Sequence, residues 1–352
     1  MKSAVIFLAV VLILSLCACT SESADSTSSA VLSQTESETV SIPTETSSEE
    51  ISSETVVSST IPESSSSVPS VAVPSSSVPA PSSKPVPSSA PAVSSSSAPE
   101  VSKVKMYEVT DPKNERGLST ARNGYGFGIA ENEKPPQMSL DNQTKFDGFN
   151  GVRALAVDTK TEEKVMYLTF DNGYEYKNLT GKILDVLKEK KVKAAFFPTL
   201  SYIKNNGNFI KRMIDEGHIV GNHSATHPDF STISRTEMAN EIYLVDKYLQ
   251  DNFGYKSYYF RFPSGAHSEC ALELVSSVGF KSIFWSVAYS DWDTGNQKGT
   301  DYAYDTVTSR FHPGAVILLH AVSVDNANAL GKIIDRAREM GYRFATLDEY
   351  YK

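Results

Sequence analysis

The chain has 352 residues, enough for one large domain and additional segments. Its formal net charge is −9, and residues 20–105 contain ten acidic residues and three lysines, so about −7 of that charge lies there. The remainder is close to neutral, which argues against a nucleic-acid-binding surface. Of the three cysteines only Cys270 lies beyond residue 19, so the folded part cannot form an internal disulfide.

Residues 1–19 are typical of an export signal. Lys2 precedes an apolar run over residues 4–16, which is too short to span a membrane comfortably. The run ends in L-C-A-C, which resembles a bacterial lipobox, and the small Ala18 favours Cys19 over Cys17 as the lipidated residue. An ordinary cleaved signal peptide is the alternative. We expect a lipid-anchored protein on the extracellular face of the cytoplasmic membrane, reaching into the cell wall of a Gram-positive bacterium.

Two segments separate this signal from the main domain. Residues 20–105 are rich in Ser, Pro, Val, Thr and Glu and almost free of aromatic residues, so they predict a disordered linker. Residues 106–163 show turn signals but no clean periodicity. We interpret them as an N-terminal extension packed on the main domain, which we place at residues 164–352.

Strand and helix patterns alternate in the main domain. Predicted strands span residues 165–170, 193–199, 218–222, 257–262, 281–287, 315–320 and 343–347. Predicted helices span residues 178–190, 209–216, 235–252, 268–278, 302–311 and 326–340, with Ser234 and Glu237 as a capping box. Repeated βα units predict a parallel sheet with helices outside. No Gly-rich dinucleotide turn follows the first strand, so the pattern favours an α/β fold of the deformed (β/α)7 barrel type over a doubly wound sheet.

Five of the predicted strands end in ionisable or ligand side chains. These are Asp171 and Asn172 after the first strand, His223 and His227 after the third, Arg261 in the fourth, Asp291 with Trp292 after the fifth, and His320 at the end of the sixth. In a barrel the carboxyl ends of the strands meet at one face, where active sites lie. We therefore expect these side chains to form one site.

His223 and His227 are four residues apart, the spacing that in a helical turn points two rings to one side, as metal ligands require. Two surface histidines without a ligand are the alternative. The Asn172 carbonyl oxygen can act as a third ligand. Two imidazoles and an oxygen suit Zn²⁺, with Co²⁺, Mn²⁺ and Mg²⁺ as further possibilities for a divalent cofactor that activates water and polarises a carbonyl.

The remaining ionisable residues suggest a base and an acid. Asp171 can take a proton from the attacking water, and Arg261 can pair with it and keep it ionised. His320 can act as the general acid, with Asp291 favouring its imidazolium form. The alternatives are a structural Arg–Asp bridge and a core histidine at a strand end.

Other polar and aromatic residues carry weaker signals. Trp292 and Tyr174, with Phe230 and Tyr289, can line a sugar-binding groove, although most aromatic residues are expected in the core. Cys270 is interpreted as a small buried residue and not as a nucleophile. We interpret three further histidines as non-catalytic, namely His218, His267 and His312.

The five segments, in this order, resemble the polysaccharide deacetylase (NodB-homology) superfamily. Its motifs T-F-D-D-G, H-S-x-x-H, R-x-P-x-G, Asp-Trp and L-x-x-H correspond here to residues 169–173, 223–227, 261–265, 291–292 and 317–320. T-F-D-N-G-Y-E, F-F-P-T, E-G-H-I-V-G-N-H-S, L-L-H-A-V-S-x-D-N-A and the upstream G-Y-G-F…P-P-Q are similar to the branch of δ-lactam-forming muramic acid de-N-acetylases.

This resemblance implies a metal-dependent, amide-hydrolysing N-deacetylase that acts on N-acetylmuramic acid in peptidoglycan, after peptide removal and with formation of the muramic δ-lactam. It implies Asp171 as base, His320 as acid, and Arg261 and Asp291 as their partners. It also implies that a backbone N–H near Ser264 stabilises the oxyanion. The expected partners are glycan strands and the membrane, with a monomeric protein.

Two departures from the family pattern bear on this reading. Asn172 stands where most members have Asp, which should weaken metal binding, although the muramic acid branch shares it. Ala288 occupies the first position of the usual D-x-x-D-W pattern. The alternatives are a deacetylase of N-acetylglucosamine, chitin-like or xylan chains, and a non-catalytic wall-binding lipoprotein.

Overall fold

The computed structural model describes residues 106–352. The predicted signal peptide, the lipidated Cys19 and the linker lie outside the described residues. Within residues 106–352, no helix combines the length and the apolar character needed to cross a membrane.

The described chain begins with a helix and then alternates strands and helices. The strands are β1 (Ala154–Leu155), β2 (Val165–Asn172), β3 (Ala195–Pro198), β4 (Ile219–Val220), β5 (Tyr259–Phe260), β6 (Lys281–Ile283), β7 (Ala315–His320) and β8 (Arg343–Ala345). The helices are α1 (Gln137–Gly148), α2 (Leu179–Lys190), α3 (Leu200–Asn205), α4 (Gly207–Asp215), α5 (Arg235–Phe253), α6 (Glu269–Ser277), α7 (Thr300–Thr308), α8 (Val324–Glu339) and α9 (Leu347–Tyr350), with a 3₁₀ turn at Pro263–Gly265.

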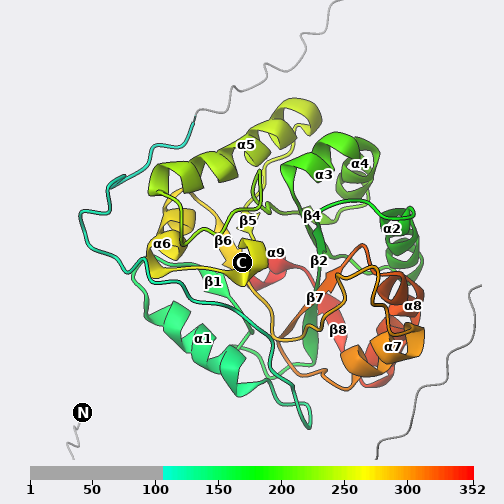
Figure 1. Ribbon diagram of the computed structural model, residues 1–352. Coiled ribbons are helices and arrows are strands. Elements are labelled where there is room, and N and C mark those ends of the chain that lie inside the picture. Colours follow the sequence, from blue (N-terminus) through cyan, green and yellow to red (C-terminus); the bar gives the residue numbers. More distant parts are fainter. Residues whose placement is uncertain (1–105) are drawn as a thin grey trace, which may run out of the picture. The chain divides into compact units, whose positions relative to one another are not determined.

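Six strands form a closed ring in sequence order, with helices around it (Figure 1). One sheet has the order β4-β3-β2-β7 and the other β1-β6-β5, and all strand pairs are parallel. Single bridges between Asn222 and Phe260 and between Val287 and Ile317 join the two sheets. The predicted α/β barrel is thereby confirmed. The short β4, β5 and β6, with isolated bridges in place of full ladders, account for its deformed character.

The last strand lies outside this ring. Met166 and Tyr167 of β2 pair with both β7 and β8, so β8 lies on the side of β2 opposite β7. This is the side of β3, which pairs with the later residues of β2. The predicted seventh strand therefore exists, but it flanks the start of β2 instead of entering the ring.

Alternation along β2 divides its side chains between two apolar clusters. Val165 and Tyr167 belong to the cluster inside the ring, together with Val316 of β7. Met166 and Leu168 belong to the larger cluster that includes residues of α2, α4 and α8. Because side chains alternate along a strand, Asp171 follows the inward set and Asn172 the outward set. The register pairs Asp171 with His320 on β7, so these two residues lie side by side.

The predicted helices are confirmed within a few residues, and the capping box of Ser234 and Glu237 is present at α5. The helices α1, α3 and α9 were not predicted. Pro136 precedes α1 without a capping side-chain hydrogen bond, and α3 and α9 span only 6 and 4 residues. Short helices show little hydrophobic periodicity in the sequence, and an uncapped helix has no capping residue to mark its start. Tertiary packing supplies most of the stability of such helices, and the local sequence does not record it.

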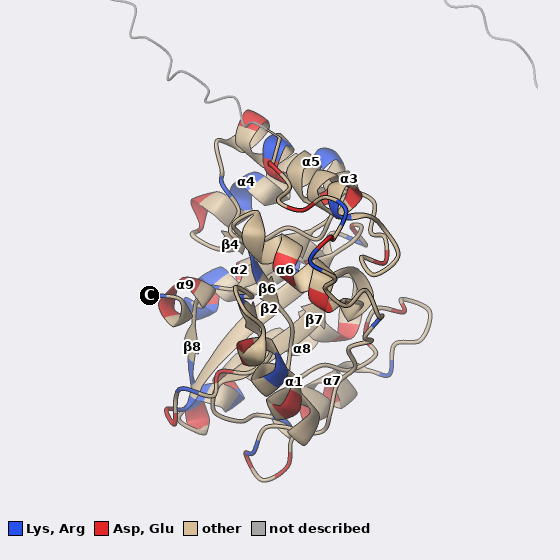
Figure 2. Ribbon diagram, turned by 90° about the vertical axis from the view of Figure 1, so that its left-hand side faces the viewer, with Lys and Arg blue, Asp and Glu red and all other residues tan. Residues whose placement is uncertain are grey.

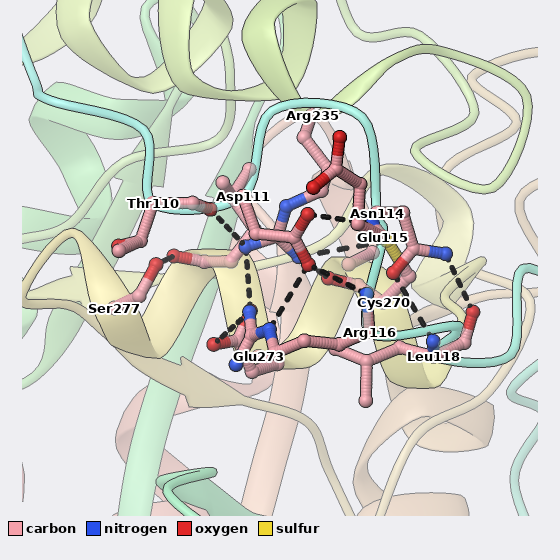
Figure 3. Close-up of polar contacts among 12 residues, drawn as sticks. Thr110, Asp111, Asn114, Glu115, Arg116, Leu118, Arg235, Cys270, Glu273 and Ser277 are labelled. Atoms are coloured by element: carbon pink, nitrogen blue, oxygen red, sulfur yellow. Dashed lines mark hydrogen bonds and ion pairs between the residues drawn. The ribbon is translucent and has the colours of Figure 1, made fainter.

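The start of the described chain crosses α5 and α6 through a group of ion pairs (Figure 3). Arg235 of α5 donates to the Thr110 carbonyl at 3.0 Å and to Glu273 of α6 at 2.6 Å. Arg116 binds the other oxygen of Glu273 at 2.8 Å and also binds Asp111 at 3.0 Å. Elsewhere basic and acidic residues are interspersed over the elements in view (Figure 2), as expected for a nearly neutral domain.

Candidate active site

Asp171, at the end of β2, is paired with a fully buried arginine. Nη1 of Arg261 donates to Asp171 Oδ1 at 2.8 Å, and its other donors bind the carbonyls of Ile283 and Phe284 at 3.0 and 3.2 Å. Burial alone would raise the pKa of Asp171, but the Arg261 guanidinium, with a further contribution from His320, holds that pKa below its usual range. Asp171 is therefore an ionised carboxylate, as a general base requires.

His223 faces the second oxygen of Asp171. Its Nδ1 lies 2.9 Å from the Arg261 carbonyl, which can only accept, so Nδ1 carries the proton. Nε2 then presents its lone pair 3.7 Å from Asp171 Oδ2. Burial lowers the pKa of His223 to about 4, against the opposing effect of Asp171, so the ring is neutral. This is the tautomer and charge state that a metal-binding histidine needs.

The second histidine of the pair lies against the first. The ring centroids of His223 and His227 are 4.9 Å apart with the planes at 78°. The helical turn expected for this spacing is wrong, because the segment is an irregular loop in which Ser224 and His227 have φ of 67° and 62°. The Ser224 hydroxyl accepts from the His227 N–H at 3.0 Å and closes this loop. The two rings converge through left-handed backbone and not through helical geometry.

Asn172 completes a donor set that fits a metal ion. Its side chain is fully buried, and its Oδ1 has no hydrogen-bond partner among residues 106–352. An unpaired buried acceptor is costly, and a cation is one way to satisfy it. Residues 106–352 contain no group of three His, Cys, Asp or Glu that could hold a metal. A metal site built on His223 and His227 therefore needs a ligand of another kind, and the unpaired Asn172 Oδ1 is a neutral oxygen of that kind.

His320, at the end of β7, forms the second charged pair of the site. Its Nδ1 lies 2.6 Å from Oδ1 of the buried Asp291. Asn326 Nδ2 donates to the other oxygen at 2.5 Å and fixes that carboxylate. Burial lowers the pKa of His320, but Asp291 outweighs this effect, and the net pKa is raised above its ordinary value. His320 is therefore suited to donate a proton.

These residues surround one cavity of about 580 Å³. The predicted site residues that line it are Asp171, Tyr174, His223, His227, Ser264, Trp292 and His320. The other three, Asn172, Arg261 and Asp291, do not line it. Arg261 and Asp291 bind the lining residues Asp171 and His320. Tyr174 and Trp292 are each 51% exposed, so their rings are available to a sugar.

Some residues of the cavity wall were not singled out as site residues. Tyr125 and Phe127, from the N-terminal extension, lie in the wall beside Trp285. The Tyr125 hydroxyl donates to the Trp285 carbonyl at 2.8 Å and anchors this segment. The G-Y-G-F motif contains both extension residues and was the available signal, but its position over the cavity depends on tertiary packing.

The polar residues interpreted as non-catalytic do not line this cavity. None of His218, His267 and His312 is among its lining residues. Cys270 is buried in α6 and lies 3.6 Å from Nη1 of Arg235.

Comparison with known proteins gives the family. The sequence profile of the family Polysaccharide deacetylase matches residues 158–283. The peptidoglycan-N-acetylmuramic acid deacetylase PdaA of Bacillus subtilis is 40% identical over 231 residues, which cover 64% of this chain and 84% of PdaA. The chain belongs to the polysaccharide deacetylase family. This membership confirms the predicted enzyme class, a hydrolase of the polysaccharide deacetylase type.

Further similarities lie within the same family. The peptidoglycan-N-acetylglucosamine deacetylase of Bacillus cereus is 32% identical over 226 residues, covering 61% of this chain and 79% of that protein. The solved structure of Bacillus subtilis PdaA, a family 4 carbohydrate esterase, matches with a TM-score of 0.62 and 39% identity, covering 66% of this chain and 97% of that one.

Proposed function

We propose that this polysaccharide deacetylase removes the N-acetyl group from N-acetylmuramic acid residues of peptidoglycan, with the help of a divalent metal ion. The observation that carries the proposal is the pairing of a carboxylate of lowered pKa, Asp171, with an imidazole of raised pKa, His320, at adjacent strand ends beside one cavity. A pair of titratable groups whose pKa values are shifted in opposite directions is the usual arrangement for a general base and a general acid.

In this mechanism Asp171 takes a proton from a water molecule as the water oxygen attacks the acetyl carbonyl carbon. Arg261 keeps the carboxylate ionised and oriented through its 2.8 Å hydrogen bond. His320 donates its proton to the amide nitrogen as the carbon–nitrogen bond breaks, and Asp291 keeps the imidazole protonated until then. The products are acetate and the free amine of the sugar.

Further groups would polarise the carbonyl of the substrate and stabilise the oxyanion that forms from it. Asn172, His223 and His227 would hold the metal ion, Zn²⁺ by the nature of its ligands. When bound, the ion supplies Lewis-acid polarisation of the carbonyl and lowers the pKa of water. A backbone N–H near Ser264 would stabilise the oxyanion. The left-handed backbone of Ser264, with φ 52°, and its position in the cavity wall support this assignment.

The similarity to PdaA over most of both proteins, and the N-terminal wall segment with its G-Y-G-F motif, support muramic acid as the substrate sugar. The amine set free by deacetylation can form an amide with the lactyl carboxyl of the same sugar, with loss of the carboxyl oxygen as water, only where no peptide occupies that carboxyl. We therefore place the reaction on peptide-free glycan, with the δ-lactam as the final product.

The 32% identity to an N-acetylglucosamine deacetylase supports a second candidate, in which that sugar is the substrate. Mass spectrometry of peptidoglycan and of peptide-stripped glycan, after incubation with the purified full-length protein and Zn²⁺, separates the two. We expect acetyl loss from muramic residues of peptide-stripped glycan. Loss only from glucosamine residues would replace the substrate assignment, and no loss from either sugar would favour the non-catalytic wall-binding protein.

We also propose that Cys19 is lipidated and that the protein is a monomer tethered to the outer face of the cytoplasmic membrane by residues 20–105. The lipobox-like L-C-A-C sequence and the composition of the linker support this proposal. Membrane fractionation of cells expressing the wild type and Cys19→Ala tests it. The wild type should sediment with membranes and the variant should not, whereas equal sedimentation would contradict the anchor.

A further inference from the structure

The Asn172 side chain has one fixed end and one free end. Its Nδ2 donates to Thr180 Oγ1 of α2 at 3.4 Å, whereas Oδ1 is buried without a partner among residues 106–352. An amide has two ends of nearly the same shape and opposite polarity. A threonine hydroxyl can accept from the NH₂ end or donate to the oxygen end, and here Thr180 accepts, which leaves the Asn172 oxygen on the free side.

Thr180 is itself held on two sides. Its backbone N–H donates to Glu175 Oε1 at 3.3 Å. The Tyr202 hydroxyl lies 2.9 Å from both Glu175 Oε2 and Thr180 Oγ1 and donates its single proton to these two acceptors in turn. Thr180 and Tyr202 are 0% and 1% exposed, so water does not compete for these bonds. One carboxylate thus fixes both hydroxyl residues.

The backbone beside Asn172 is also fixed. The Thr199 N–H donates to the Asn172 carbonyl at 3.1 Å, and the Thr199 hydroxyl donates to the Gly173 carbonyl at 3.2 Å. The same hydroxyl accepts from the Tyr202 N–H at 3.3 Å and so caps α3. The end of β3 therefore positions both the Asn172 main chain and the helix that carries Tyr202.

We propose that Thr180, held in place by Tyr202 and Glu175, is a positioning residue that orients the Asn172 amide so that Oδ1 is presented as the third metal ligand. The inference rests on the proposed metal site. Without the Thr180 hydroxyl the amide can turn, and its NH₂ group would face the cation. Aspartate at position 172 would not need this control, because both of its ends are oxygens.

The test compares Thr180→Val, which removes the hydroxyl and keeps the shape, with Thr180→Ser, which keeps the hydroxyl. The readout is the dissociation constant for Zn²⁺ alone on the full-length protein, measured by competition with a chromophoric chelator. We expect Thr180→Val to raise this constant about tenfold or more, as outer ligand partners typically do, and Thr180→Ser to stay near the wild type. Tyr202→Phe, which frees Thr180, should raise it less. Thermal unfolding checks that each variant is folded.

Repeating the comparison in an Asn172→Asp background isolates orientation from general damage. There Thr180→Val should change the dissociation constant much less than in the wild type. An equal change in both backgrounds, or wild-type affinity in Thr180→Val and Tyr202→Phe, would overturn the inference while leaving the proposed function standing. A wild-type protein that binds no Zn²⁺ would overturn the inference together with the proposed metal site.

Discussion

Nδ1 of His320 lies 2.6 Å from Oδ1 of Asp291, and the backbone N–H of the same histidine donates to Oδ2 at 2.7 Å. One residue thus engages both oxygens of a buried carboxylate. Because Nδ1 is occupied by Asp291, Nε2 is the ring atom left to donate a proton to a substrate.

Asp291→Asn should move the alkaline limb of the pH–rate profile to lower pH. Burial lowers the pKa of His320 and Asp291 is the main group that raises it, so loss of Asp291 lowers that pKa, with only the weaker effect of Asp171 left to oppose burial. His320 is active as an acid only below its pKa, so activity disappears at lower pH. The measurement is kcat/KM for acetate release against pH. The exposed Asp293→Asn is the matched control and should leave the limb in place. An unmoved limb in Asp291→Asn would contradict the pairing.

Arg261→Met should move the acidic limb to higher pH. The guanidinium keeps the pKa of Asp171 low against its burial, so removing the charge raises that pKa, and the base becomes available only at higher pH. The same variant leaves a buried carboxylate unpaired, which should lower the free energy of unfolding by about 3–5 kcal/mol. Denaturant unfolding measures this loss.

Arg261→Lys is the control for the charge. It keeps the positive charge but loses the hydrogen bonds to the Ile283 and Phe284 carbonyls. It should therefore be destabilised while its acidic limb stays closer to that of the wild type. If both variants show the same shift, the charge of Arg261 is not its cause.

Chelation should abolish activity, and Zn²⁺ or Co²⁺ should restore it, because the unpaired Asn172 oxygen and the neutral His223 ring form a donor set for such ions. Alkylation with iodoacetamide should leave activity unchanged, because Cys270 is 2% exposed and does not line the cavity. Acetate release and bound metal content are the measurements. Loss of activity on alkylation together with resistance to chelators would instead indicate a cysteine hydrolase.

Glu273→Gln should weaken the contact between the start of the described chain and helices α5 and α6, and so destabilise the protein. Arg235 is 2% exposed and loses its carboxylate partner, so we expect a loss of about 2 kcal/mol in the free energy of unfolding. Glu163→Gln removes an exposed partner of Arg343 at 3.3 Å and should change stability little. Urea unfolding of the two variants measures both effects. Equal losses in both would contradict a special role for the partly buried Arg235–Glu273 pair.

Much of the fold was predictable from local pattern. The seven predicted strands are all present, because V-M-Y-L-T-F and A-V-I-L-L-H are apolar, β-favouring runs bounded by turn residues. The place of β8 beside the start of β2 could not be predicted. Strand order at a closure depends on which long-range pairing buries more surface, and no local signal records it.

The candidate site was predictable where residues follow strand ends. Asp171 and His320 end neighbouring parallel strands, so the barrel brings them together without further information. The loop of His223 and His227 was predicted with the wrong local geometry, since left-handed φ at non-glycine residues has no clear sequence signal. The contact of Tyr125 with Trp285 joins residues 160 positions apart. Such contacts depend on tertiary packing.

The account is tested most directly by acetate release from peptide-free peptidoglycan glycan, comparing the full-length wild type with Asp171→Asn in the presence of Zn²⁺. Asp171→Asn keeps the shape of the base and removes its capacity to take a proton. We predict that the wild type releases acetate from muramic residues and that the variant is slower by at least about 10². Equal rates in the two proteins, or no release by the wild type, would contradict the assignment of Asp171 as the base of a muramic acid deacetylase.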